Sequence, residues 1–201
     1  MSAARGRLVL VVGPSGAGKD TLIGLAQAAC AGNSGVVFPR RIVTREASAH
    51  EPNLRLSPAE FDEALARGDF ALHWDAHGLR YALPRSIADD LAAGRTVVAN
   101  VSRTVIDAAR ARFARANADV VVALVTAPAE VLAARLALRQ RASDGRLDER
   151  LGRSATLAEI SPDVTISNTG RAEDHAGDLL AVILRGGETA ARSAQGRAAG
   201  D

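Results

Sequence analysis

Residues 13 to 20 constrain the fold of this 201-residue chain more than any other segment. They read Gly-Pro-Ser-Gly-Ala-Gly-Lys-Asp, which matches a phosphate-binding loop except at the last position, where Asp20 replaces the usual Ser or Thr. A buried-strand pattern, 8–12, precedes the loop, and a helical pattern, 21–31, follows it. This order of strand, glycine loop and helix predicts a loop that holds a nucleotide's phosphates, in preference to a glycine-rich turn without function.

The residue types of the loop suit a chain of phosphates. Glycines let the backbone curl so that successive N–H groups point inward, and the dipole of the following helix attracts anions. Lys19 adds a positive charge for the β- and γ-phosphates. We expect the nucleotide to contact Gly13, Pro14, Ser15, Gly16, Ala17, Gly18, Lys19, Asp20 and Thr21.

Asp20 and Thr21 are the candidate magnesium ligands. A loop Ser or Thr normally contacts Mg²⁺ through its hydroxyl, whereas Asp20 offers a harder oxygen but adds negative charge close to the phosphates. Thr21 could contribute instead, and Asp20 could simply be a first-turn acid that the helix dipole favours. We predict metal contact by Asp20, directly or through water.

Composition places the chain among globular proteins with one core and small appendages. The hydrophobic content of 47% and the charged content of 24% are ordinary. A net charge of +2 and an aromatic content of 3% do not suggest a nucleic-acid partner. Cys30 is the sole cysteine, which excludes an intrachain disulfide and a cysteine-built metal site and fits a reducing compartment.

The apolar run before the glycine loop covers only residues 8–12. A secretory signal needs roughly 7–15 apolar residues, and a membrane span needs roughly 20, which no stretch approaches. We therefore expect a cytoplasmic protein without a membrane partner.

Local signals divide the first half of the chain. A second strand is predicted over 36–44, after a turn at 32–35. Ser57, Pro58 and Glu60 form a helix start with a capping box, and Gly68 ends that helix. Residues 70–83 are typical of a hairpin around His77-Gly78, and Pro84 is expected to open a helix that ends near Gly94.

The second half alternates regularly between strands and helices. This alternation predicts an α/β fold with a parallel sheet and helices on both faces. We expect one domain over 1–185, with an inserted hairpin subdomain at about 40–83, an arginine-rich lid at about 139–153, and a disordered tail at 186–201. Strands are predicted at 96–100, 119–125 and 164–167, and helices at 105–116, 128–141, 147–158 and 172–185.

Three further clusters could carry chemistry. Arg40, Arg41 and Arg45 lie with Thr44 at the end of the second predicted strand. Ligands of open α/β sheets bind at the carboxyl edge of the strands, and a guanidinium group matches two phosphate oxygens at once. A solvated basic strand end would have the same sequence, but the glycine loop at the first strand's end favours a shared phosphate site.

The predicted hairpin contains the second cluster. Trp74 and Tyr81 are the only Trp and Tyr of the chain, and His77 and Arg80 lie between them. Trp74 is expected to pack in the hairpin. His77, Arg80 and Tyr81 are candidates for ligand contact because each can donate a hydrogen bond to a phosphate or a hydroxyl.

The third cluster is rich in arginine. Arg135 and Arg139 are four residues apart and would share a helix face, and Arg150 and Arg153 follow a flexible connector, 142–145. This arrangement predicts a lid that brings arginines to the transferring phosphates. A solvated basic helix is the alternative.

These pieces resemble the guanylate-kinase branch of the P-loop kinases over nearly the whole chain to residue 185. The resemblance is carried by the loop at 13–19, Thr44-Arg45, Tyr81, the arginine lid and the strand at 163–168. Within that branch the Gly-Lys-Asp loop and the segments 40–45, 70–81 and 100–103 are more similar to the ribose 1,5-bisphosphate phosphokinases of phosphonate breakdown. The resemblance implies a P-loop NTPase fold, ATP and Mg²⁺ as cofactors, and a position for Asn168 near the adenine.

Asn100 and Ser102 bear on the choice of acceptor. Guanylate kinases typically carry Asp-x-Asp at these positions, where carboxylates lie near the guanine edge. Without the carboxylates a guanine site loses much of its discrimination, whereas an arginine-rich crevice suits a compact sugar with two phosphates. We expect the acceptor to contact Arg41, Thr44, Arg45, His77, Arg80, Tyr81, Asn100 and Ser102.

The function implied is transfer of the ATP γ-phosphoryl group to the 1-phosphate of ribose 1,5-bisphosphate. Lys19, Arg135, Arg139 and Arg150, with Arg153 as a further candidate, would neutralise the charge that moves in the transition state. A kinase for GMP or another nucleoside monophosphate is an alternative. A non-catalytic binding module for a phosphorylated protein is a second one, although such a module would have no need of Gly18 and Lys19. The sequence leaves the oligomeric state open.

Overall fold

The computed structural model describes residues 5–44, 53–76, 78–116, 118–139 and 161–184. The chain divides into two compact units: residues 1–10 and 32–120 form the first, and residues 11–31 and 121–201 form the second. Most of the predicted lid at 139–153, the helix expected at 147–158 and the tail at 186–201 lie outside the described residues.

The larger sheet has five strands in the order β2-β7-β1-β8-β9. In the first unit β2 pairs parallel with β7, and Val36 lies opposite Thr96. In the second unit β8 pairs parallel with β9, and Thr126 lies opposite Ser167. The parallel sheet of an α/β fold is therefore confirmed. Its strands are β1 (Arg7–Val12), β2 (Val36–Val37), β7 (Thr96–Asn100), β8 (Asp119–Thr126) and β9 (Val164–Ser167).

The strands of this sheet form where apolar residues run without interruption. Leu8 through Val12 are all 0% exposed, as expected of a strand that is covered on both faces. The helices between the strands are amphipathic, and in the second unit α1 packs along α7. None of the helices in the described ranges has both the length and the apolar character needed to cross a bilayer. The helices are α1 (Lys19–Ala29), α2 (Pro58–Arg67), α3 (Ile87–Ala92), α4 (Ile106–Ala114), α5 (Ala129–Arg139) and α7 (Ala172–Leu184), with a 3₁₀ turn η1 (Arg103–Val105) before α4.

The single strand predicted over 36–44 is wrong. The structure has two short strands there, β2 in the five-stranded sheet and β3 (Ile42–Val43) in a second sheet. Pro39 lies between them and lacks the N–H that a sheet ladder needs, so the chain leaves one sheet before it enters the other. Pro84 likewise does not open a helix: it ends β6, and α3 begins at Ile87.

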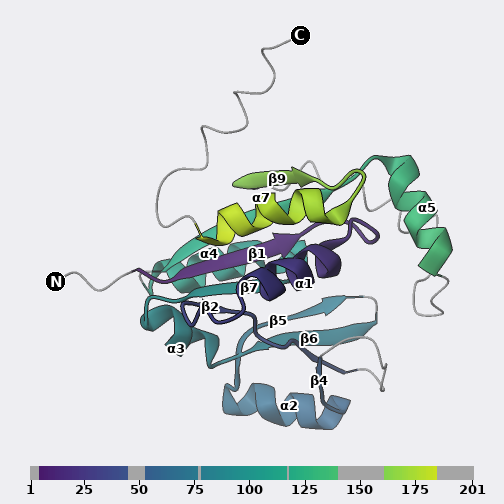
Figure 1. The fold of residues 1–201 in the computed structure, drawn as a ribbon. Coiled ribbons are helices and arrows are strands. Elements are labelled where there is room, and N and C mark those ends of the chain that lie inside the picture. The colour runs from purple at the N-terminus through teal and green to yellow at the C-terminus, as the bar shows by residue number, and fades with distance from the viewer. Residues whose placement is uncertain (1–4, 45–52, 77, 117, 140–160, 185–201) are drawn as a thin grey trace. The chain divides into compact units, whose positions relative to one another are not determined.

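The second sheet has the order β4-β3-β6-β5 and belongs to the first unit. It contains the predicted hairpin, in which β5 (Phe70–Ala76) and β6 (Leu79–Pro84) are antiparallel. The short edge strand β4 (Leu54–Arg55) was not predicted. Helix α2 covers one face of this sheet (Figure 1), where Phe61 and Ala64 pack with Ile42, Phe70 and Ala82.

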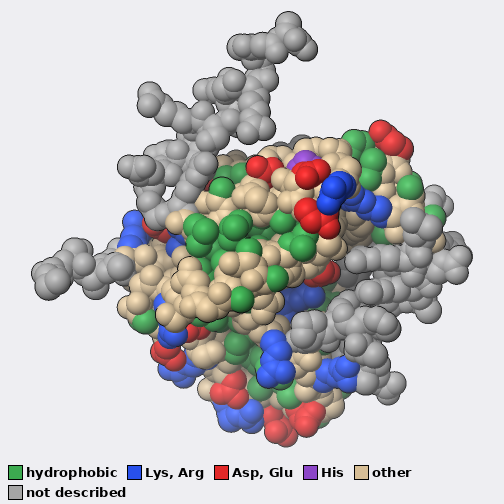
Figure 2. Space-filling model, viewed as in Figure 1, with side chains coloured by type: hydrophobic (Ala, Val, Ile, Leu, Met, Phe, Trp, Pro, Cys, Tyr) green, Lys and Arg blue, Asp and Glu red, His purple; other side chains and the backbone are tan. Residues whose placement is uncertain are grey.

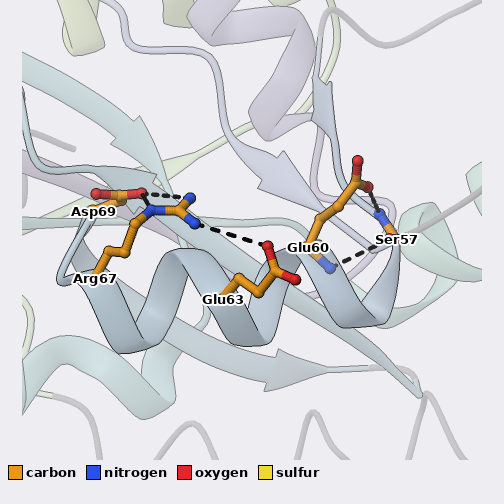
Figure 3. A network of polar contacts seen from close by, with 5 residues as sticks. All are labelled: Ser57, Glu60, Glu63, Arg67 and Asp69. Carbon is orange, nitrogen blue, oxygen red and sulfur yellow. Dashed lines mark hydrogen bonds and ion pairs between the residues drawn. The ribbon is translucent and has the colours of Figure 1, made fainter.

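The predicted caps of α2 are present (Figure 3). The Ser57 hydroxyl accepts a hydrogen bond from the Glu60 N–H at 3.3 Å, and the Ser57 N–H donates to Glu60 Oε2 at 2.6 Å. Gly68 ends the helix with φ at 75°. Hydrogen bonds from the Ser57 backbone and side chain hold the pKa of Glu60 below its ordinary value, because they stabilise the carboxylate.

Because the Glu60 carboxylate caps α2, the stability of the wild type should depend on pH more strongly than that of a variant without this carboxylate. Because the pKa of Glu60 is lower in the folded than in the unfolded chain, its contribution is present above the unfolded pKa and is lost as pH falls through the folded pKa. In Glu60→Gln the amide oxygen can still accept from Ser57 but does not titrate. Urea unfolding below about pH 5 should therefore show a smaller loss of stability for Glu60→Gln than for the wild type, and parallel curves would contradict this assignment.

Candidate nucleotide and acceptor sites

The glycine loop joins β1 to α1, and residues 13–18 belong to the second unit. The Ala17 N–H donates to the Pro14 carbonyl at 3.3 Å, which closes the loop. The Lys19 ammonium donates to the carbonyls of Gly13 at 2.8 Å and Pro14 at 3.0 Å. The positive charge is therefore held against the curled backbone, which is the arrangement expected of a phosphate site.

Two loop glycines are required by backbone angle and by space. Gly13 has φ at 144°, and a Cβ there would lie 2.0 Å from the Val125 carbonyl oxygen of β8. Gly18 has φ at 89°, and its Cβ would lie 2.3 Å from Asn168 Nδ2. Both angles are ones that side chains with a Cβ rarely adopt. The glycines thus let the loop pack tightly as well as curl.

Two predicted site residues, Arg135 and Asn168, contact this loop. In α5, Arg135 is half-buried, and its guanidinium donates to the Gly16 carbonyl at the long distance of 3.5 Å. Asn168 directly follows β9 and is 2% exposed, and its Nδ2 donates to the Ala17 carbonyl at 2.7 Å. Arg139 ends α5, but its side chain and the whole of Arg150 and Arg153 lie outside the described residues.

Asp20 and Thr21 occupy the first turn of α1, and both side chains are exposed. A carboxylate and a hydroxyl beside a phosphate loop match the hard oxygen ligands of Mg²⁺. Within the described ranges no group of three or more His, Cys, Asp or Glu side chains could hold an ion. Since Mg²⁺ usually takes few protein carboxylates and completes its shell with phosphate oxygens and water, these two residues fit a nucleotide-bound magnesium.

Tyr81 lies in an aromatic stack of the first unit. Its ring stacks on Trp74 across the hairpin at 5.6 Å between centroids, and the Arg41 guanidinium carbon lies 5.9 Å from the Tyr81 centroid. Trp74 is 6% exposed, which confirms its predicted packing role. Arg41 and Tyr81 are half-buried and remain candidates for the acceptor.

Arg80 points to the other face of the same strand, because successive side chains of a strand alternate. Its guanidinium pairs with Asp62 of α2 at 2.6 Å and lies 4.3 Å from the centroid of the Phe61 ring. Its backbone N–H donates to the Thr44 hydroxyl at 2.9 Å. From the sequence, Arg80 and Tyr81 were both predicted as candidates for ligand contact. The structure separates the two side chains and gives Arg80 a partner, Asp62, that no sequence signal identified.

The remaining acceptor candidates belong to the same unit. Asn100 ends β7, and Ser102 caps η1, where its hydroxyl accepts from the Thr104 N–H at 3.4 Å and from the Thr104 hydroxyl at 3.0 Å. Arg45 and His77 lie outside the described residues. The structure therefore brings Arg41 and Tyr81 together, and it places the Thr44 hydroxyl against the Arg80 backbone of the same strand pair, β3 and β6.

Charges of both signs are interspersed on the face shown in Figure 2. Lys and Arg side chains lie beside Asp and Glu side chains across the described part of this surface. The described part of this face therefore offers no broad basic surface, and the case for anion binding depends on local groups, such as Lys19 at the glycine loop.

The packing around Gly13 predicts that alanine substitutions at two glycines of the second unit have opposite effects on stability. Gly13→Ala should destabilise the fold by about 1–3 kcal/mol or more, since it adds a strained backbone angle and a clash with Val125. Gly24 lies exposed within α1 with open space around it, so Gly24→Ala should stabilise by up to about 1 kcal/mol. Urea unfolding measures both. An unchanged stability of Gly13→Ala would contradict the close packing of Gly13 against Val125.

Comparisons with known proteins agree with the geometry of the loop. No family profile matches the chain. It is 61% identical over 181 residues to a ribose 1,5-bisphosphate phosphokinase PhnN of Rhodopseudomonas palustris, covering 90% of each chain. It is also 61% identical over 178 residues to the protein of that name from Bradyrhizobium diazoefficiens, covering 89% of this chain and 88% of the relative.

A more distant relative and a solved structure are also similar to this chain. The PhnN protein of Methylobacterium radiotolerans is 52% identical over 176 residues, covering 88% of this chain and 96% of the relative. A crystal structure of guanylate kinase from Anaplasma phagocytophilum has a TM-score of 0.68 at 17% identity, covering 91% and 87% of the two chains, which shows a shared fold. The expected guanylate-kinase-like P-loop fold is thereby confirmed, and the chain belongs to the family of ribose 1,5-bisphosphate phosphokinases PhnN.

Proposed function

We propose that the protein transfers the γ-phosphoryl group of ATP to the 1-phosphate of ribose 1,5-bisphosphate, giving ADP and 5-phospho-α-D-ribose 1-diphosphate. The observation that carries this proposal is the identity of 52–61%, over about nine-tenths of the chain, to proteins named for phosphorylation of that sugar. The glycine loop with Lys19 held against it supports the same reaction class, since every such kinase needs a grip on the donor phosphates.

The donor phosphates are assigned to the loop of the second unit. Its backbone N–H groups and Lys19 would bind the β- and γ-phosphates, and the dipole of α1 would add to the attraction. Arg135, whose guanidinium reaches the Gly16 carbonyl, is near enough to the loop to contact a phosphate bound there. ATP is the expected nucleotide. The family resemblance implies a position for Asn168 near its adenine, a role against which the 2% exposure of this side chain argues.

The chemistry needs charge neutralisation more than a base. The acceptor is itself a phosphate with a second pKa of about 6, so it is largely dianionic near neutral pH and can attack without losing a proton. The barrier comes from repulsion between anions. Lys19 and Arg135 would lower it, and Arg139, Arg150 and Arg153 are the further arginines that we propose for this role.

Magnesium fits the same site. Asp20 and Thr21 would hold it in the first turn of α1, and the bound ion would neutralise the β- and γ-phosphate oxygens. Asp20 is the stronger candidate because its carboxylate is a better ligand for a hard cation than a hydroxyl.

The acceptor is assigned to the first unit. Arg41 and Tyr81 share one face of the second sheet, and both can donate a hydrogen bond to a phosphate. We propose Arg45 and His77 as further contacts of the acceptor. Asn100 and Ser102 supply neutral groups that suit sugar hydroxyls. Arg80 is already paired with Asp62, so we assign it to holding β6 and α2 in place.

Product analysis tests the acceptor. With ATP and Mg²⁺, we expect kcat/KM for ribose 1,5-bisphosphate to exceed that for GMP by about 100-fold or more, since a site lacking polar partners for guanine loses its binding energy. Phosphorus NMR should show a diphosphate at C1 of the ribose. Lys19→Ala is the control that separates this activity from a contaminating kinase. Faster turnover of GMP would make the protein a nucleotide kinase, and failure to bind ATP would favour a binding module.

Magnesium titration tests Asp20. In Asp20→Ala the Mg²⁺ concentration for half-maximal activity should rise by about tenfold or more, because an oxygen ligand or its water contact is removed. Asp174→Ala is a matched control, since it removes an exposed first-turn aspartate from α7 and leaves the metal site intact. An unchanged Mg²⁺ requirement in Asp20→Ala would show that Asp20 acts only on the helix dipole.

A further inference from the structure

Asn168 is the one polar side chain that is buried among the described residues. It is held where two strands of the second unit end: its backbone N–H donates to the Thr126 carbonyl, the last residue of β8, at 2.8 Å, and it follows Ser167, the last residue of β9. Paired parallel strands are a rigid frame. The position of the amide group is therefore fixed by the sheet.

From this frame the amide holds the glycine loop. Nδ2 donates to the Ala17 carbonyl at 2.7 Å, across 151 residues of sequence. The contact is so close that a side chain at Gly18 would overlap it. Because an oxygen in the place of Nδ2 would face another acceptor, the hydrogen bond also fixes which way the amide is turned.

The bond orients a peptide that would face the phosphates. In a trans peptide the C=O and the following N–H point in opposite directions. With the Ala17 carbonyl turned to Asn168, the Gly18 N–H points away from it, and among the described residues no backbone carbonyl accepts from that N–H. N–H groups presented in this way form the anion-binding concavity of a phosphate loop.

We propose that Asn168 is a positioning residue, which fixes the Ala17–Gly18 peptide and so keeps the loop in its phosphate-binding shape. It acts on the nucleotide through the loop backbone, and the inference holds whichever acceptor the protein uses. A direct contact with the base is a different role, to which a side chain that is 2% exposed offers little surface.

The burial of this amide agrees with a role in the loop. Its Oδ1 has no hydrogen-bond partner in the described structure, so the group is only half satisfied. A half-satisfied buried amide costs free energy relative to an apolar side chain of the same shape. The bond from Nδ2 to Ala17 is what this position gains from an asparagine.

Binding of inorganic tripolyphosphate distinguishes a positioning role of Asn168 from a direct contact with the base, because this probe has phosphates and no base. Calorimetry in the presence of Mg²⁺ would compare tripolyphosphate with ATP. In Asn168→Ala both affinities should fall by the same factor, about tenfold, which corresponds to loss of one buried hydrogen bond. Ser167→Ala, an exposed neighbour on β9, should bind both as the wild type does. A loss for ATP alone, or no loss in a folded variant, would overturn the proposal.

Asn168→Asp keeps the test decisive if removal of the side chain unfolds the protein. A carboxylate cannot donate to the Ala17 carbonyl, but the neutral carboxyl can, and burial raises the pKa of such a group. The tripolyphosphate affinity of Asn168→Asp, divided by the wild-type affinity at each pH, should therefore rise as pH falls. A ratio that does not change with pH would contradict the proposed hydrogen bond.

Discussion

The close packing of the glycine loop is the constraint on which the second unit of the molecule depends. Gly13 touches the backbone of β8, Gly18 touches the amide of Asn168, and Gly16 lies against Leu132 and Leu136 of α5. At Gly13 and Gly18 a Cβ would overlap the neighbouring atoms, and at Gly16 it would be tightly packed at 3.2 Å. The glycines therefore serve two purposes: they permit the curled backbone, and they let three other elements support it from outside.

Support from outside matters because of how such a loop binds. It binds phosphates through backbone N–H groups. These groups cannot turn as side chains do, so their direction is set only by the orientation of the peptide planes. A loop that is ordered before the nucleotide arrives loses less conformational entropy on binding and places its dipoles where charge develops. The Ala17 carbonyl bound to Asn168 and the Lys19 ammonium bound to two loop carbonyls are the visible parts of that order.

Local signals in the sequence were enough for much of the fold. The strand before the loop, the loop itself, the capping box at Ser57 and the hairpin around Gly78 were predicted because each depends on residues within a few positions of one another. One strand was predicted over 36–44, where the structure has two strands in different sheets, because the apolar pattern was given more weight than Pro39. The contact between Asn168 and Ala17 joins residues far apart in the chain, and no local pattern contains it.

The prediction that Arg80 and Tyr81 both contact the ligand failed for a different reason, since the sequence did contain the information against it. Adjacent residues of a strand face opposite ways, so the predicted hairpin already implied that the side chains of Arg80 and Tyr81 could not contact one small ligand. The separation gives the hairpin two functions. On one face Arg80 joins β6 to α2 through Asp62 and the Phe61 ring. On the other, Trp74 supports Tyr81, and Tyr81 lies beneath the Arg41 guanidinium. The Arg41 guanidinium carbon lies 5.9 Å from the centre of this supported ring, within the range of a cation–π contact. The contact restrains the side chain that we propose for binding a phosphate of the acceptor.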